Sequence, residues 1–265
     1  MKKHLIIGNP INHSLSPKLH NYWFKKNKID AIYEKKIAED STIKDVINDI
    51  KNDKIFGINV TVPFKKKITD YIEVLSGTAQ KTNSVNTICK KNGKIYGDNT
   101  DVFGFEMSII NLNIEIKEKT ALIFGAGGVV PSIILALKNL GIKKIFITNR
   151  SSEKIKTLKL KFPEIEEINI KESSSFDFYI NATSLGLKET DKLNINFNKI
   201  EPNKFFYDVI YNPPMTNFLK EAKKFGHKIS NGEMMFIYQA QKSFEIWHNV
   251  LPIIDQELVN FLKND

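Results

Sequence analysis

The feature that most constrains the fold is a glycine-rich turn between a hydrophobic run and a helical pattern. The run over residues 120–125 is apolar and ends in Gly125-Ala126-Gly127-Gly128, and a helical pattern follows over 129–140. Glycines let the backbone turn sharply and approach a pyrophosphate, whose charge then lies at the helix N-terminus. A tight structural turn would also use glycine, but the flanking strand and helix favour a nucleotide site.

The next strand-like run, over 143–149, favours NADP over NAD. It ends in Asn149 and is followed by Arg150 and Ser151. A fold that binds NAD usually ends this strand with an acidic residue that hydrogen-bonds the ribose 2′-hydroxyl. A carboxylate would repel a 2′-phosphate, whereas a guanidinium pairs with it and can stack on adenine. Arg150 is the only arginine in a chain otherwise supplied with lysine, so we favour this role over a solvated surface residue.

Strand and helix patterns alternate along the whole chain. Before the glycine turn we expect strands at 4–8, 31–37 and 56–62, helices at 16–27, 41–52, 63–72 and 102–114, and a hairpin over 86–97. After it we expect strands at 143–149, 177–183 and 205–211, and helices after Ser151 and at 215–226, 233–247 and 251–262. The alternation restarts at Thr120, which indicates two α/β domains.

Composition excludes several other classes of protein. The net charge is +9, but the lysines are scattered among acidic residues, so we expect no nucleic-acid partner. Cys89 is the only cysteine, which rules out an intrachain disulfide and favours a reducing compartment. The N-terminal apolar run is too short for a signal peptide, and no stretch approaches the ~20 apolar residues of a membrane span. We therefore expect a cytoplasmic protein with no membrane partner, and no metal, because no ligand-spaced cluster is present.

Several polar residues lie where a parallel sheet would present them to a ligand. Ser14 and Ser16 flank the start of a predicted helix. The simplest interpretation of Ser16 is an N-cap, although two hydroxyls at a helix N-terminus also suit a small carboxylate. Asn59, Thr61 and Lys65 lie at or after the end of a predicted strand. Each of these residues alone would be unremarkable on a solvated surface.

Taken together, an ordered series of motifs resembles the shikimate dehydrogenase family. The motifs run from GNPINHSLSPKLHN through NVTVPFK, SVNT, GDNTDVFG, FGAGG, NRSS, NATSLG and DVIYNPPMT to NGEMMFIYQA. The resemblance implies an N-terminal substrate-binding α/β domain with a mostly parallel sheet, over 1–101, completed by C-terminal helices from about 233 to 265 that pack back on it. It also implies a Rossmann-like NADP-binding domain over 102–232.

The resemblance further implies reversible, NADPH-dependent reduction of 3-dehydroshikimate to shikimate, in the pathway of aromatic amino acid biosynthesis. Lys65, two residues after Pro63, and Asp101 would be the catalytic pair. The pair would also bind substrate, together with Ser14, Ser16, Thr61, Asn86, Tyr211 and Gln239. The cofactor would contact Gly125, Ala126, Gly127, Gly128, Asn149, Arg150, Ser151, Thr183, Gly232 and Met235. The oligomeric state stays open between monomer and homodimer.

The chain departs from the family pattern at three places. Val129-Val130-Pro131 follows the glycine turn where small residues are usual, Asn83 and Ser84 replace glycine and alanine before VNT, and Glu233 stands near the expected cofactor. Two alternative functions stay open. One is a quinate/shikimate dehydrogenase that uses NAD, which Arg150 disfavours. The other is a non-catalytic NADP-binding regulator, which would not need Lys65 and Asp101.

Overall fold

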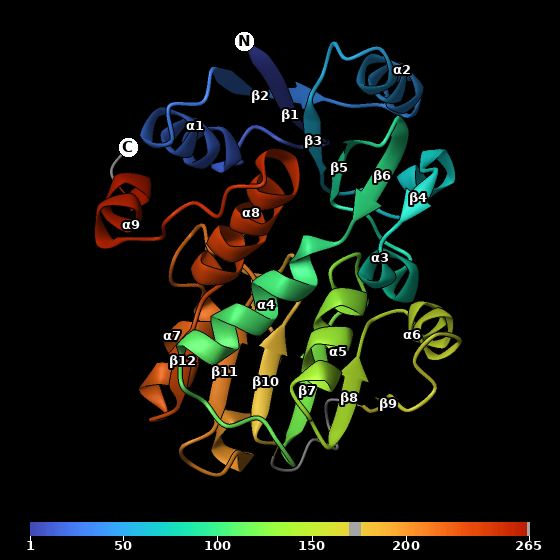
Figure 1. Cartoon of the computed structure of the whole chain (residues 1–265). Coiled ribbons are helices and arrows are strands. Elements are labelled where there is room, and N and C mark those ends of the chain that lie inside the picture. The colour runs from blue at the N-terminus through green and yellow to red at the C-terminus, as the bar shows by residue number, and fades with distance from the viewer. Residues whose placement is uncertain (170–175, 264–265) are drawn as a thin grey trace. The chain divides into compact units, whose positions relative to one another are not determined.

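A computed structural model describes residues 1–169 and 176–263 of the chain. The chain forms two compact units (Figure 1). Unit 1 comprises Met1–Gly104 and Ile237–Asp265, and unit 2 comprises Phe105–Phe236. Within the described ranges, no helix combines the length and apolar character needed to cross a membrane.

Unit 1 is built on a six-stranded sheet in which parallel pairs predominate. Its strands are β1 (Lys2–Gly8), β2 (Ala31–Ile37), β3 (Gly57–Val60), β4 (Val74–Leu75), β5 (Thr87–Lys91) and β6 (Lys94–Asp98). The strand order is β2-β1-β3-β5-β6-β4. β1 pairs in parallel with β2 and β3, whereas β5 runs antiparallel to β3 and β6. The hairpin predicted at Asn92-Gly93 is confirmed, since both residues adopt positive φ there.

The helices of unit 1 follow from amphipathic patterns. They are α1 (Ser16–Lys26), α2 (Asp40–Lys51), a 3₁₀ turn (Lys67–Tyr71), α3 (Gly77–Thr82), the first turn of α4 (Thr100–Asn111), most of α8 (Glu233–His248) and α9 (Gln256–Lys263). In α2, Ile43, Val46, Ile47 and Ile50 lie on one face and are buried against the sheet. Trp23 of α1 donates from its indole nitrogen to the carbonyl of Ile253, so the C-terminal segment packs on the N-terminal helix.

Unit 2 has the strand order of a doubly wound dinucleotide-binding fold. Its strands are β7 (Thr120–Phe124), β8 (Lys144–Thr148), β9 (Glu166–Glu167), β10 (Phe178–Asn181), β11 (Phe205–Asp208) and β12 (Lys228–Ser230), ordered β12-β11-β10-β7-β8-β9. All neighbouring pairs are parallel. The order reverses between β7 and β10, and ligands of such sheets bind at the carboxyl ends of the strands at this switch point. The glycine turn follows β7 directly.

The helices of unit 2 connect these parallel strands. They are α5 (Val130–Asn139), α6 (Ser152–Lys159), α7 (Asn217–Lys224) and a 3₁₀ turn (Phe197–Lys199). α5 is buried along most of its length, including Ile133, Ile134 and Leu137. α7 begins at a threonine cap, because the hydroxyl of Thr216 accepts from the N–H of Leu219.

Three details of the predicted secondary structure were wrong. The helix expected over 63–72 is a 3₁₀ turn that starts only at Lys67. The last helix starts at Gln256 rather than 251, with the carboxylate of Asp255 accepting from the N–H of Leu258. Ser16 is the first residue of α1 rather than its cap, and Leu15 holds the cap position without a side-chain bond.

Candidate active site

Lys65 is held in a loop that a buried aromatic side chain anchors. The loop leaves β3, and Phe64, only 4% exposed, packs into the core of unit 1. The N–H of Phe64 donates to the carbonyl of Thr61, and the carbonyl of Lys65 accepts from the N–H of Val85. These contacts fix the backbone on both sides of Lys65, so its side chain reaches inward although its neighbours Lys66 and Lys67 are exposed.

Asp101 lies in the first turn of α4 and pairs with Lys65. The Nζ of Lys65 lies 2.6 Å from the Oδ2 of Asp101, and the two side chains are only 14% and 7% exposed. Asn99 caps the helix, because its Oδ1 accepts from the N–H of Asp101 at 3.1 Å. A carboxylate in the first turn is also favoured by the helix dipole. The predicted catalytic pair is therefore assembled within unit 1, partly screened from water.

Asn86 connects this pair to further polar side chains. Its Nδ2 donates to the Oδ1 of Asp101 at 2.9 Å and lies 3.4 Å from the Oε1 of Gln239. Its Oδ1 accepts from the N–H of Thr100 at 2.7 Å. Asn86 is 2% exposed, so these bonds are made in a dry environment. Four of the predicted substrate residues, Lys65, Asn86, Asp101 and Gln239, thus lie together.

The two serines also lie together, at the N-terminus of α1. The hydroxyl of Ser14 donates to the hydroxyl of Ser16 at 3.1 Å and accepts from the N–H of Ser16 at 3.2 Å. The hydroxyl of Ser14 therefore satisfies the N–H of Ser16, the first residue of α1, although Ser16 was the expected capping residue. Thr61 follows β3, and its methyl group packs against Gly8. A Cβ added to Gly8 would lie only 2.3 Å from that methyl carbon. This glycine lets the two chain segments approach.

The glycine turn of unit 2 is open toward a ligand. Gly125 has φ +109, and a Cβ there would lie 2.8 Å from the carbonyl oxygen of Ala182, so this glycine is required by the fold. A Cβ on Gly128 would meet no protein atom within 4 Å. The N–H groups of Ala126, Gly127 and Gly128 donate to no group in the described part of the chain. Free N–H groups and open space before α5 fit a pyrophosphate.

The residues after β8 are arranged around the start of α6. The Nδ2 of Asn149 donates to the carbonyl of Ser151 at 2.9 Å, which closes the turn that carries Arg150. Ser151 holds the cap position of α6 but makes no capping bond. Arg150 is exposed. The guanidinium and the Ser151 hydroxyl fit a phosphate at this strand end.

Of the other predicted residues of unit 2, Thr183, Tyr211 and Gly232 lie in loops and Met235 lies in the first turn of α8. Both the N–H and the hydroxyl of Thr183 donate to the Oδ1 of Asn181. A Cβ on Gly232 would lie 2.1 Å from the carbonyl oxygen of Val209, so the backbone itself requires this glycine. Met235 is 6% exposed, and the ring of Tyr211 stacks on Phe236 with centroids 4.6 Å apart.

The structure explains two of the three departures from the family pattern. Asn83 ends α3 with φ +50, a left-handed conformation that asparagine tolerates better than most residues where glycine is absent. Glu233 begins α8, where the Oδ1 of Asn231 accepts from its N–H and the helix dipole favours an acidic residue. Val130 is fully buried at the start of α5, with Pro131 in the first turn.

Two polar residues of the site were not assigned a role from the sequence. Asn59, 5% exposed, donates from Nδ2 to the carbonyl of Asn86, and Thr100, 1% exposed, bonds the side chain of Asn86. Both lie in motifs that carry other predicted residues, and Asn59 also lies near the end of a predicted strand, where a parallel sheet presents residues to a ligand. Their role depends on tertiary contacts between β3, β5 and α4.

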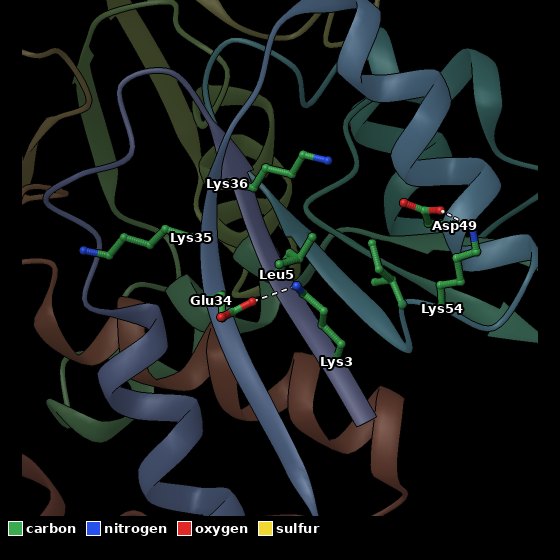
Figure 2. A pocket seen from close by; sticks show the side chains of 8 residues that line it. Lys3, Leu5, Glu34, Lys35, Lys36, Asp49 and Lys54 are labelled. Atoms are coloured by element: carbon green, nitrogen blue, oxygen red, sulfur yellow. Dashed lines mark ion pairs between the residues drawn. The ribbon is translucent and has the colours of Figure 1, made fainter. Parts of the chain in front are cut away.

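A shallow, charged pocket in unit 1 contains none of the predicted site residues. Figure 2 shows its lining, in which Lys3 pairs with Glu34 at 2.8 Å and Lys54 with Asp49 at 3.7 Å. Lys35, also on the rim, donates to the carbonyl of Asn12. Exposed ion pairs of this kind contribute little energy and are mostly solvated. The pocket therefore has no part in the site.

Family models match both halves of the chain. Residues 6–88 match the shikimate dehydrogenase substrate binding domain, and residues 108–192 match shikimate / quinate 5-dehydrogenase. A shikimate dehydrogenase (NADP(+)) from Pelagibacter ubique is 58% identical over 261 residues, which cover 98% of each chain.

Solved structures give the same result. The crystal structure of shikimate dehydrogenase from Aquifex aeolicus is 34% identical, with a TM-score of 0.90, over 100% of this chain and 98% of that one. A Thermus thermophilus enzyme, solved in complex with NADP(H) and shikimate, is 25% identical with a TM-score of 0.89, over 99% and 98% of the two chains. Two matching domain models, whole-chain relatives and the same fold lead to one conclusion: this chain belongs to the shikimate dehydrogenase family.

Proposed function

We propose that this protein catalyses the reversible reduction of 3-dehydroshikimate to shikimate with NADPH, a step of aromatic amino acid biosynthesis. The observation that carries the proposal is the ion pair of Lys65 and Asp101, at 2.6 Å, within a buried polar cluster of unit 1. Relatives that match over the whole chain are NADP-dependent shikimate dehydrogenases. The enzyme is accordingly an oxidoreductase that uses NADP.

Lys65 is the proton donor in this proposal. NADPH, when bound, supplies the hydride that reduces the ketone. As the carbonyl oxygen gains negative charge, the ammonium of Lys65 gives it a proton, and in the oxidation direction the amine takes that proton back. Asp101 orients the ammonium through the 2.6 Å contact and accepts from a ring hydroxyl of the substrate. No metal is needed for these steps.

Polar groups of unit 1 orient the substrate ring. The paired hydroxyls of Ser14 and Ser16, 3.1 Å apart, bind the carboxylate at the N-terminus of α1. Thr61, Asn86 and Gln239 hydrogen-bond the ring hydroxyls. Tyr211, which the family resemblance implies as a further substrate contact, stays a prediction.

Unit 2 binds the cofactor in this proposal. The residues that hold the pyrophosphate are those of the glycine turn, Gly125, Ala126, Gly127 and Gly128. The N–H of Gly125 donates to the carbonyl of Thr148, whereas those of the other three donate to no group in the described part of the chain. Asn149, Arg150 and Ser151 hold the adenosine 2′-phosphate. Thr183, Gly232 and Met235 line the place of the nicotinamide.

A quinate/shikimate dehydrogenase is the second candidate, because the family model for residues 108–192 is described as shikimate / quinate 5-dehydrogenase. Arg150 at the end of β8 favours NADP and so argues against an NAD-dependent enzyme of that kind. A non-catalytic regulator is disfavoured because it would have no need to bury a Lys65–Asp101 pair.

One spectrophotometric assay separates these candidates. Purified protein is incubated with shikimate or quinate and with NADP⁺ or NAD⁺, and nicotinamide reduction is followed by absorbance. We expect turnover with shikimate and NADP⁺. Preference for quinate with NAD⁺ would select the second candidate, and absence of turnover with all four pairs would select the regulator.

We also propose a cytoplasmic location, a small-molecule substrate, and no nucleic-acid or membrane partner. Cys89 is buried, and burial raises the pKa of its thiol to about 11, so it stays protonated and unreactive at neutral pH. Whether the enzyme is a monomer or a homodimer is decided by sedimentation at assay concentration.

A further inference from the structure

Tyr33 carries a hydroxyl that packing alone does not explain. It lies in the middle of β2, is 1% exposed, and stacks on the ring of His20 with centroids 4.4 Å apart. Phenylalanine would fill such an aromatic environment without burying a polar group, which is costly unless it is hydrogen-bonded. The hydroxyl of Tyr33 has such a bond, because it donates to the Oδ1 of Asn59 at 2.7 Å. Burial raises the pKa of Tyr33, so the hydroxyl stays a donor.

Ser243, on α8, bonds the other end of the Asn59 side-chain amide. It is fully buried, and its Oγ accepts from the Nδ2 of Asn59 at 3.0 Å. The same Oγ lies 3.1 Å from the Oγ1 of Thr100. Thr100 in turn bonds Asn86, which donates to Asp101. One series of hydrogen bonds therefore runs from Tyr33 through Asn59, Ser243, Thr100 and Asn86 to Asp101 of the catalytic pair.

We propose that Tyr33 and Ser243 are positioning residues, which hold Asn86 and the catalytic pair in place through a buried hydrogen-bond network. The inference rests on the proposed function, because it concerns how that site is held. Neither residue belongs to the predicted substrate or cofactor contacts. Tyr33 is on a strand and Ser243 is on the C-terminal helix, so the network also ties α8 to the sheet of unit 1.

The direction of the bonds gives each residue a distinct effect. Tyr33 donates to the amide oxygen of Asn59, and the amide nitrogen donates to Ser243 and to the carbonyl of Asn86. Without the Tyr33 hydroxyl, the oxygen of Asn59 loses its donor and the amide that supports Asn86, a predicted substrate contact, is less firmly oriented, so substrate binding should suffer most. Without the Ser243 hydroxyl, Thr100 loses a partner beside Asn86, so the rate of the chemical step should suffer most.

The test compares Tyr33→Phe and Ser243→Ala with Tyr207→Phe. Tyr207 is a matched control, because it is fully buried in unit 2 and, among the residues that the structure describes, its hydroxyl bonds only the hydroxyl of Ser108, at 3.0 Å. Shikimate oxidation with NADP⁺ gives kcat and a KM for each substrate, and thermal unfolding reports folding. Loss of one buried hydrogen bond predicts a change of about fivefold to tenfold.

We expect Tyr33→Phe to raise the KM for shikimate about fivefold to tenfold, with the KM for NADP⁺ within about twofold of wild type. We expect Ser243→Ala to lower kcat by a similar factor, and Tyr207→Phe to change neither constant. Wild-type kcat and KM values in both Tyr33→Phe and Ser243→Ala would overturn this inference but leave the proposed function intact. So would equal kinetic losses in all three variants, since those would reflect stability only. Absence of wild-type turnover would overturn the proposed function as well.

Discussion

The ammonium of Lys65 lies 2.6 Å from the carboxylate of Asp101, and both side chains are largely shielded from solvent. The two residues come from a loop after β3 and from the first turn of α4. A strong, charge-assisted hydrogen bond at this distance fixes the direction in which the lysine presents its protons.

Removal of the Lys65 amine should abolish catalysis without preventing cofactor binding. We expect Lys65→Ala to lower kcat about 10²- to 10⁴-fold, because general acid catalysis is lost. Lys65→Arg keeps a positive charge beside Asp101 but cannot release a proton at neutral pH, so it should be equally inactive. NADPH affinity, measured by fluorescence titration, should stay within about threefold of wild type. Lys66→Ala, at the exposed neighbouring position, is the control, and wild-type turnover in Lys65→Arg would contradict the role of the amine.

Reversal of the charge at Arg150 should discriminate between the two cofactors. Loss of a charge-assisted bond to the 2′-phosphate predicts a fall of about 10- to 100-fold in kcat/KM for NADP⁺ in Arg150→Glu. The value for NAD⁺, which has no such phosphate, should change little. Lys154→Glu introduces the same charge change on the exposed side of α6 and should preserve the preference for NADP⁺. An equal loss with both cofactors in Arg150→Glu would contradict a phosphate contact.

Gly125 and Gly128 should respond differently to alanine. A methyl group on Gly128 would meet no protein atom, so Gly128→Ala should unfold at the wild-type temperature but raise the KM for NADP⁺ about tenfold by crowding the pyrophosphate. Gly125→Ala should instead lower stability, because Gly125 has φ +109 and its Cβ would approach Ala182. Unchanged NADP⁺ affinity in Gly128→Ala would place the pyrophosphate elsewhere.

Two buried histidines, His4 and His20, and the partly buried His248 predict loss of stability in acid. Burial, together with the nearby charges of His248 and Lys2, lowers the pKa of His4 to about 3, and burial together with the charge of Lys2 lowers that of His248 to about 4. Burial also lowers the pKa of His20 well below its ordinary value, and neither of its ring nitrogens has a partner among the described residues. The unfolded chain therefore binds protons below pH ~6.5 that the folded protein does not bind.

Stability should accordingly be constant with respect to these groups above pH ~6.5 and fall as the pH drops toward the folded values. Each histidine adds a slope of about 1.4 kcal/mol per pH unit to the free energy of unfolding. Urea titrations at pH 7 and pH 5 measure this slope. His20→Phe retains the stacking on Tyr33 but removes one titrating group. It should therefore reduce the slope by about 1.4 kcal/mol per pH unit. An unchanged slope in His20→Phe would show that His20 is protonated in the folded state.

Much of the fold was predictable because its signals are local. Hydrophobic periodicity located the main strands and helices, and the restart of the pattern at Thr120 indicated the second sheet. The short strands β4, β9 and β12 were missed, because two or three residues carry no periodicity. The helix expected from Pro63 was wrong because Phe64 is drawn into the core and its N–H closes a turn with Thr61 instead.

The candidate site was predictable only in part. Motif order identified Lys65, Asp101 and Asn86, and the structure brings them together. Tyr33 gave no signal, since an aromatic residue in a strand is ordinarily a core residue. Ser243 lies on a helix far along the chain, and its contact with Asn59 depends on how that helix packs against the sheet.

The reversal of β5 has a consequence for how this sheet tolerates change. Because β5 is antiparallel to β3, its first residues lie opposite the end of β3, and Thr87 faces Asn59 in the register. The polar groups of the candidate site thus lie near one end of the strands. The Asn92-Gly93 turn lies at the opposite end of β5, where a Cβ on Gly93 would meet open space. Chemistry constrains one side of the sheet only, which leaves the other side available for insertions, tags or lineage-specific loops.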